Sequence, residues 1–114
     1  MAARRYDPRP QLVSEARAFV RDHTRGSTRA EDIELAASEL ATNAIRHAMT
    51  PFELSIQVAP QRIRLEVADA SPVIPALIEA PGPRHGLHIV EELAEQWGIT
   101  AIDGGKIVWA EFST

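Results

Sequence analysis

Two neighbouring segments in which apolar and polar residues alternate constrain the fold of this chain most. The apolar positions in PFELSIQVA and QRIRLEVAD are Phe52, Leu54, Ile56, Val58, Ile63, Leu65 and Val67. A period of two predicts β-strands with one buried face. We therefore expect strands at about 51–59 and 61–69, joined by a turn at 59–61. Another layer of the protein has to cover their apolar face.

Helical spacing of apolar residues elsewhere in the chain supplies that layer. The pattern predicts a first helix over about 9–25, which ends at a glycine. A second helix is predicted over about 28–49, beginning with the capping-box pair Thr28 and Glu31. A third is predicted over 86–97, again closed by a glycine.

The C-terminal segment predicts a β-hairpin, because ITAI and KIVWAEF flank the turn sequence DGG. In its last strand Val108, Ala110 and Phe112 share one face, whereas Trp109 lies on the other. Trp109 then covers the outer face of the sheet, either as an ordinary contact within the fold or as a surface for a partner. Lys106, just after the turn, either approaches a ligand pocket or is a surface lysine of the hairpin, and the second interpretation is preferred.

The order of these elements predicts the fold class, an α/β (α+β) two-layer sandwich. Its mixed, mainly antiparallel sheet has four or five strands, and three helices cover one face. Residues 71–85 contain five prolines or glycines and no sustained period, which indicates a long loop of the kind that forms lids. A chain of 114 residues fits one domain over 1–114. Solvent is expected at six polar strand positions: Glu53, Ser55, Gln57, Arg62, Arg64 and Glu66.

Composition excludes several classes of function. The net charge is -4 and the pI about 5.5, which argues against nucleic acid as a direct partner. The absence of cysteine excludes disulfides, thiolate metal sites and cysteine nucleophiles. No apolar run is long enough to span a membrane or to serve as a secretion signal. We expect a soluble, cytoplasmic protein with no membrane partner.

The second predicted helix carries an unusual polar edge. In SELATNAIRHA, Glu39, Asn43 and His47 are four residues apart, so they stack along one edge of the helix, beside its apolar arc. Polar groups at such a boundary either reach solvent or line a pocket for a polar ligand. His47 alone is more often a hydrogen-bonded core histidine than a ligand.

Two further features suggest a nucleotide pocket. Asp69 stands at the exit of a strand, where a carboxylate either accepts a hydrogen bond from an amine such as that of adenine or shapes a turn before Ser-Pro. In GPRHGLHIV a glycine-bearing loop runs into a helix, whose free N–H groups favour an anion. The letters match neither GxGxxG nor GxxxxGK[ST], so Rossmann and P-loop sites are disfavoured.

Taken together, these motifs resemble those of the histidine kinase-like ATPase superfamily, which has the Bergerat fold. ELATNAIRHA is similar to its N box, VADASP to its first glycine box and GPRHGL to its second. The chain is most similar to the small bacterial anti-sigma-factor serine/threonine kinases, from EARAFVRD to GKIVWAEF. An opening strand around ARRY is expected to be short or missing.

The resemblance implies ATP and Mg2+ as cofactors. It implies that Asn43 holds Mg2+, that Glu39 is the general base on the attacking hydroxyl and that Asp69 accepts from the adenine amine. The backbone at Gly86 and Leu87 would cradle phosphate.

Three basic residues complete the implied site. Arg84 is the candidate lid cation that neutralises the transferred phosphoryl group, or equally a solvated loop residue. Arg46 and His47 would lie near the phosphates.

The function implied is an ATP-dependent serine/threonine protein kinase that phosphorylates an antagonist protein in partner switching with a sigma factor. The alternative is a nucleotide-binding module that sequesters a partner with little turnover. An intact Glu39 favours the kinase, whereas the second glycine box, with Arg84 where relatives often have a leading glycine, favours the binder. Ser71 stands where many relatives have glycine in the first box, a change that adenine recognition through Asp69 survives. The catalytic domain of a sensor histidine kinase fits less well, because the chain has no room for a phosphoacceptor domain. A homodimer is left open.

Overall fold

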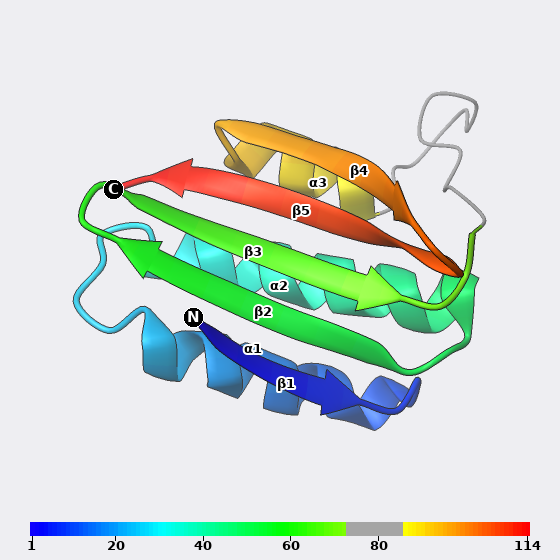
Figure 1. The fold of residues 1–114 in the computed structure, drawn as a ribbon. Helices are drawn as coiled ribbons and strands as arrows, with labels where there is room; N and C mark the ends of the chain where they lie inside the picture. The colour runs from blue at the N-terminus through cyan, green and yellow to red at the C-terminus, as the bar shows by residue number, and fades with distance from the viewer. Residues whose placement is uncertain (73–85) are drawn as a thin grey trace.

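The computed structural model describes residues 1–72 and 86–114. In chain order the elements are β1 (Ala2–Tyr6), a 3-10 turn η1 (Pro10–Leu12), α1 (Val13–His23), α2 (Ala30–Asn43), a π-helical turn η2 (Ala44–Ala48), β2 (Phe52–Ala59), β3 (Arg62–Asp69), α3 (Gly86–Leu93), β4 (Gln96–Ile102) and β5 (Gly105–Ser113). The sheet order is β1-β2-β3-β5-β4, and α1, α2 and α3 lie on one face of it (Figure 1). The predicted two-layer sandwich is confirmed.

The sheet is more regular than the sequence predicts. All four pairings between described strands are antiparallel, so the sheet is not mixed. The opening strand that was expected to be short or missing is present as β1, which pairs with β2 along its length. The two alternating segments form β2 and β3 within a residue of the predicted bounds.

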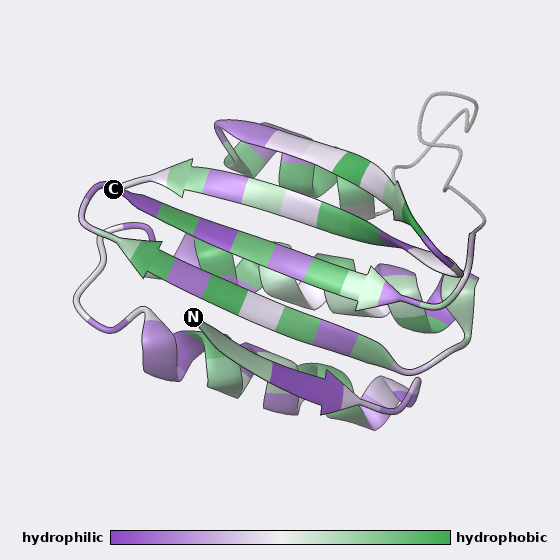
Figure 2. Ribbon diagram, viewed as in Figure 1, coloured by the Kyte–Doolittle hydropathy of each residue, from purple (hydrophilic) through white to green (hydrophobic). Residues whose placement is uncertain are grey.

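The apolar face of the sheet packs against the helices and forms the core. Figure 2 shows the alternation of hydrophobic and hydrophilic residues along β3. The buried strand residues include Phe52, Leu54, Ile56, Ile63, Leu65, Val67, Val108, Ala110 and Phe112. The central helix α2 buries three alanines against them, Ala36, Ala37 and Ala41, whose small side chains let the helix approach the sheet closely.

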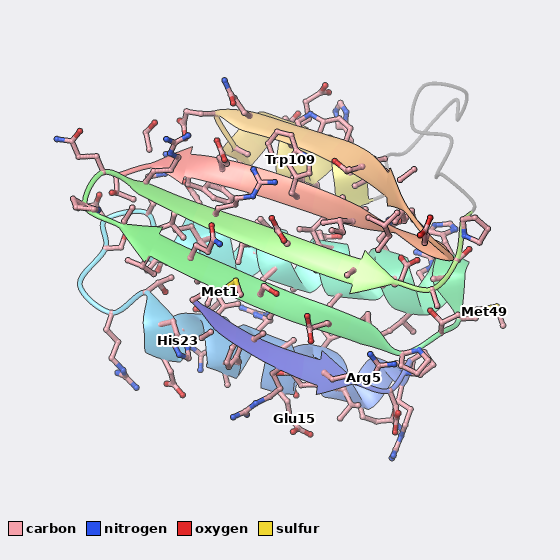
Figure 3. The ribbon with its side chains drawn as sticks, viewed as in Figure 1. Met1, Arg5, Glu15, His23, Met49 and Trp109 are labelled. Atoms are coloured by element: carbon pink, nitrogen blue, oxygen red, sulfur yellow. The ribbon has the colours of Figure 1, made fainter. Side chains whose placement is uncertain are left out.

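Of the six polar strand positions expected to face solvent, five are exposed or partly exposed on the outer face of the sheet. The exception is Ser55, which is buried where β2 lies between its two neighbours. Trp109 stands on this face (Figure 3). Its ring has the guanidinium carbon of Arg64 at 4.4 Å from the centroid and covers Gly98, its cross-strand partner. The structure thus gives Trp109 an ordinary contact within the fold.

The predicted helix ends need correction. The third helix stops at Leu93 rather than Trp97, and β4 begins at Gln96. The reason is non-local, because Gly98 has to pair with β5 beneath Trp109. The first helix is regular only over Val13–His23 instead of 9–25. No described helix has the length and apolarity needed to cross a bilayer.

The predicted capping box does not form at the start of α2. The residue before the helix is Arg29, and no side chain caps the free N–H groups there. Ser27 Oγ instead accepts a hydrogen bond from the Arg29 N–H at 3.1 Å, upstream of the helix. The turn is therefore organised by Ser27, not by Thr28 with Glu31.

Candidate functional site

Three elements converge on one end of the molecule. There α2 ends, β3 ends and α3 begins (Figure 1). The segment after α2 is tied to the segment after β3, because Thr50 Oγ1 accepts a hydrogen bond from the Ala70 N–H at 3.1 Å. The predicted N box, the first glycine box and, of the second glycine box, the described residues Gly86 and Leu87 thus lie at this end.

Asn43 is the last residue of α2, and it is buried, with 5% of its surface exposed. Its side-chain oxygen Oδ1 has no hydrogen-bond partner among the described residues. A buried acceptor without a partner costs about 1–3 kcal/mol, so it is rarely left in a fold without a purpose. The oxygen is therefore available to a ligand.

Immediately after Asn43 the helix widens into the π-helical turn η2. The Met49 N–H donates to the Ala44 oxygen at 3.1 Å, five residues back, and Met49 then adopts a left-handed φ of 57° that ends the helix. Such turns are frequent at functional sites. η2 carries Arg46 and His47, both exposed, and contacts β3.

Glu39 lies one helical turn before Asn43 and is half-buried. Its carboxylate makes no hydrogen bond or ion pair within the part of the chain that the structure describes. The structure therefore places it on the same edge as Asn43, as predicted, with its charge available.

Asp69, at the end of β3, forms a buried ion pair that the sequence interpretation missed. Lys106 Nζ lies 3.1 Å from each carboxylate oxygen, and both side chains are only 2% exposed. Asp69 Oδ1 also accepts the Ser71 N–H at 2.9 Å, and Lys106 Nζ donates to the Ser71 oxygen at 3.3 Å. The interpretation of Lys106 as a surface lysine is wrong.

A close backbone approach holds this pair in register. Gly105 begins β5 next to the end of β3, and a Cβ at this position would overlap the Asp69 carbonyl oxygen. Strand parity is the sequence signal that could have found Lys106. It shares a face with Val108, Ala110 and Phe112, so it faces the helices as they do.

The start of α3 brings backbone N–H groups to the same end. Gly86 is its first residue, and the next residue, Leu87, is fully buried, so the core anchors the first turn. The first N–H groups of a helix lack partners within it, which suits an anion. Arg84 and residues 73–85 of the predicted lid lie outside the described residues.

The residues present fit a magnesium site only if the ligand supplies most of the oxygens. Among residues 1–72 and 86–114, no group of three or more His, Asp or Glu side chains could hold a metal ion. The buried Asn43 oxygen is of the type that Mg2+ prefers. One protein oxygen together with phosphate oxygens and water is a common magnesium arrangement.

A known protein family accounts for nearly the whole chain. The model of the histidine kinase-like ATPase domain family matches residues 6–112. No curated protein sequence matches the chain.

Among solved structures, the RsbU and RsbW domains of Rv1364c from Mycobacterium tuberculosis align with a TM-score of 0.74 and 19% identity. The alignment covers 100% of this chain but 33% of that one, so this chain spans a third of its length. The Acinetobacter baumannii histidine kinase AdeS aligns with a TM-score of 0.59 and 17% identity, over 99% of this chain and 68% of that one. The histidine kinase domain of the E. coli osmosensor EnvZ aligns with a TM-score of 0.54 and 15% identity, over 100% of this chain and 89% of that one.

These likenesses show a shared fold, and the family match shows kinship. Because that match spans nearly the whole sequence, the chain belongs to the histidine kinase-like ATPase family.

Proposed function

We propose that this member of the histidine kinase-like ATPase family binds ATP with Mg2+ and acts as an anti-sigma-factor-like serine/threonine protein kinase. Its substrate would be an antagonist protein in a partner-switching system that controls a sigma factor. The buried Asn43 oxygen, which has no hydrogen-bond partner among the described residues, carries the proposal, because it lies at the end of the molecule where β3 ends and α3 begins.

Each element has a task in the proposed site. Asn43 Oδ1 would hold Mg2+, which when bound neutralises charge on the phosphates and orients them. The N–H groups at Gly86 and Leu87 would bind phosphate oxygen. Asp69 would bind the base.

Glu39 is the candidate general base. In the proposed transfer, the hydroxyl oxygen of a serine or threonine of the antagonist forms a bond to the γ-phosphorus. The bond between that phosphorus and the bridging oxygen of ADP breaks. Glu39 accepts the hydroxyl proton, for which an unpaired, half-buried carboxylate is suited. Arg84 is proposed to neutralise the transferred group.

The comparisons support the proposal at the level of fold. A structure that contains an RsbW domain has a TM-score of 0.74 with this chain, higher than those of the two histidine kinases quoted above. The sequence motifs favour the same branch of the family. The identity of the antagonist and of the sigma factor would follow from the proteins encoded beside this one.

Nucleotide binding is tested by thermal or urea unfolding with and without ATP and Mg2+. At about a hundredfold excess of ligand over Kd, the free energy of unfolding should rise by about 2.7 kcal/mol. Asn43→Ala should reduce this gain, and removal of Mg2+ with a chelator should reduce it in the wild type but hardly in Asn43→Ala. The absence of any shift with adenine nucleotides would overturn the proposal.

Turnover is tested by transfer of labelled phosphate from ATP to a co-encoded antagonist protein. Glu39→Gln should lower the rate by about a hundredfold or more while nucleotide binding is retained. Glu31→Gln is the matched control, because Glu31 is an exposed glutamate on the same helix, two turns earlier. Equal transfer by wild type and Glu39→Gln would exclude Glu39 as the base.

The alternative is a nucleotide-binding module that sequesters its partner with little turnover. One observation favours it, namely that the second glycine box has Arg84 where relatives often have a leading glycine. ATP binding without transfer to the antagonist, together with a nucleotide-dependent affinity for it, would establish this alternative.

A further inference from the structure

The ion pair between Asp69 and Lys106 leaves one hydrogen-bonding position on each partner. A carboxylate oxygen has two lone-pair positions. Asp69 Oδ1 uses both, because it accepts from Lys106 Nζ and from the Ser71 N–H. Oδ2 lies 3.1 Å from Lys106 Nζ and retains one lone-pair position that can accept a hydrogen bond.

Lys106 is left with one donor. Its ammonium carries three N–H groups. The two oxygens of the Asp69 carboxylate, each 3.1 Å from Nζ, share one of these N–H groups. The Ser71 main-chain oxygen accepts another at 3.3 Å. The third has no acceptor within residues 1–72 and 86–114. The pair therefore presents an acceptor and a donor side by side.

We propose that Lys106 is a specificity-determining residue that donates directly to N1 of adenine, while Asp69 Oδ2 accepts from the 6-amino group. This inference rests on the proposed nucleotide binding. The edge of adenine carries one donor, the 6-amino group, next to one acceptor, N1, which complements the pair atom for atom. Guanine carries one acceptor and two donors there, so it needs two acceptor positions where Asp69 has one left.

The burial of the pair makes this reading selective. Both side chains are 2% exposed, so a base that reaches them has lost its contact with water. A polar atom left unmatched in such a place is costly, whereas on the surface water would replace the missing partner. Ser71 is half-buried and Pro72 is exposed, so the pair lies close to the surface at the end of β3, from which a base can approach.

The test compares ATP with 1-deaza-ATP, in which C–H replaces N1 and the 6-amino group is kept. Wild-type protein should bind ATP about tenfold or more tightly than 1-deaza-ATP, as measured by calorimetry. Equal affinities would overturn the role of Lys106 while the proposed function stands. Failure of both nucleotides to bind would instead overturn the proposed function itself.

Two variants assign the effect to Lys106. Lys106→Met removes the donor, and it should bind ATP and 1-deaza-ATP with equal affinity. Lys106→Gln also removes the charge next to Asp69 but keeps an N–H donor, so it should retain a preference for ATP. A preference that persists in Lys106→Met would contradict the proposal. If a variant does not fold, the Nζ resonance of Lys106 in isotope-labelled wild type decides, because it should shift with ATP and not with 1-deaza-ATP.

Discussion

Arg29 Nη1 lies 2.9 Å from Oε1 and 3.2 Å from Oε2 of Glu95. The same guanidinium donates to the main-chain oxygens of Leu93 at 2.6 Å and Ser113 at 3.0 Å. One side chain just before α2 therefore holds the end of α3 and the end of β5. Since α3 begins at the candidate phosphate site, Arg29 helps to fix that helix from its far end.

Arg29→Ala should lower the free energy of unfolding by about 2 kcal/mol, because several charge-assisted hydrogen bonds and two main-chain contacts are lost together. Arg25→Ala is the matched control. Its ion pair with Asp22 joins two side chains that are 74% and 61% exposed. It should change stability by less than about 0.5 kcal/mol. Urea unfolding measures the free energy of unfolding of both variants. Equal losses in the two variants would show that the contacts of Arg29 stabilise the fold no more than an exposed ion pair does.

The sequence predicts the strands and the polar edge of α2 because the patterns that indicate them lie within a few consecutive residues. Alternation predicts β2 and β3, and a spacing of four places Glu39 and Asn43 on one edge of a helix. Spacing does not reveal that the Asn43 oxygen is buried without a hydrogen-bond partner in residues 1–72 and 86–114. That fact depends on how the sheet, α2 and η2 pack.

The errors arise where distant segments override local preference. Trp97 and the glycine after it suit a helix and its C-terminal stop, yet pairing with β5 places both in a strand. Lys106 looks like a surface residue next to a turn. It is buried because its position in β5 faces the helices and because its ammonium pairs with Asp69. An ion pair between residues 37 positions apart has no local signature.

Gly105→Ala should destabilise the fold by about 2 kcal/mol or more, because the added methyl group meets the Asp69 main chain and not a flexible side chain. Gly104→Asn is the matched control in the neighbouring residue. Gly104 has a left-handed φ of 72° and open space around its Cβ position, and asparagine tolerates that conformation. The control should lose less than about 1 kcal/mol by urea unfolding. A larger loss at Gly104 would contradict the close-approach argument.

Stability should fall with acid because two glutamates are held ionised by arginines. Hydrogen bonding from Arg21 lowers the pKa of Glu34 from its usual 4.5, and hydrogen bonding from Arg64 does the same for the pKa of Glu111. A carboxyl group with a lower pKa in the folded state stabilises the fold above its unfolded pKa. That contribution is lost as the pH falls through the folded pKa.

The free energy of unfolding should therefore be level above about pH 5 with respect to these groups and should decline below about pH 4.5. Glu34→Gln should be less stable at neutral pH and should show a shallower decline in acid, by urea unfolding at a series of pH values. A decline as steep as that of the wild type would mean that Glu34 does not contribute to it.

Two substitutions of Asn43 should move stability and ligand binding in opposite directions. Asn43→Leu replaces a buried oxygen that has no partner in the described part of the chain with an apolar group of similar size. The ligand-free protein should therefore be equally stable or more stable by up to about 1 kcal/mol. Stabilisation by ATP with Mg2+ should disappear.

Asn43→Asp keeps an oxygen for the metal but buries a charge, so the free energy of unfolding of the ligand-free protein should fall by about 1–3 kcal/mol. Mg2+ with ATP should restore part of that loss, and urea unfolding of both variants with and without ligand measures these differences. Destabilisation of the ligand-free protein by Asn43→Leu would mean that the oxygen serves the fold and is not held for a ligand.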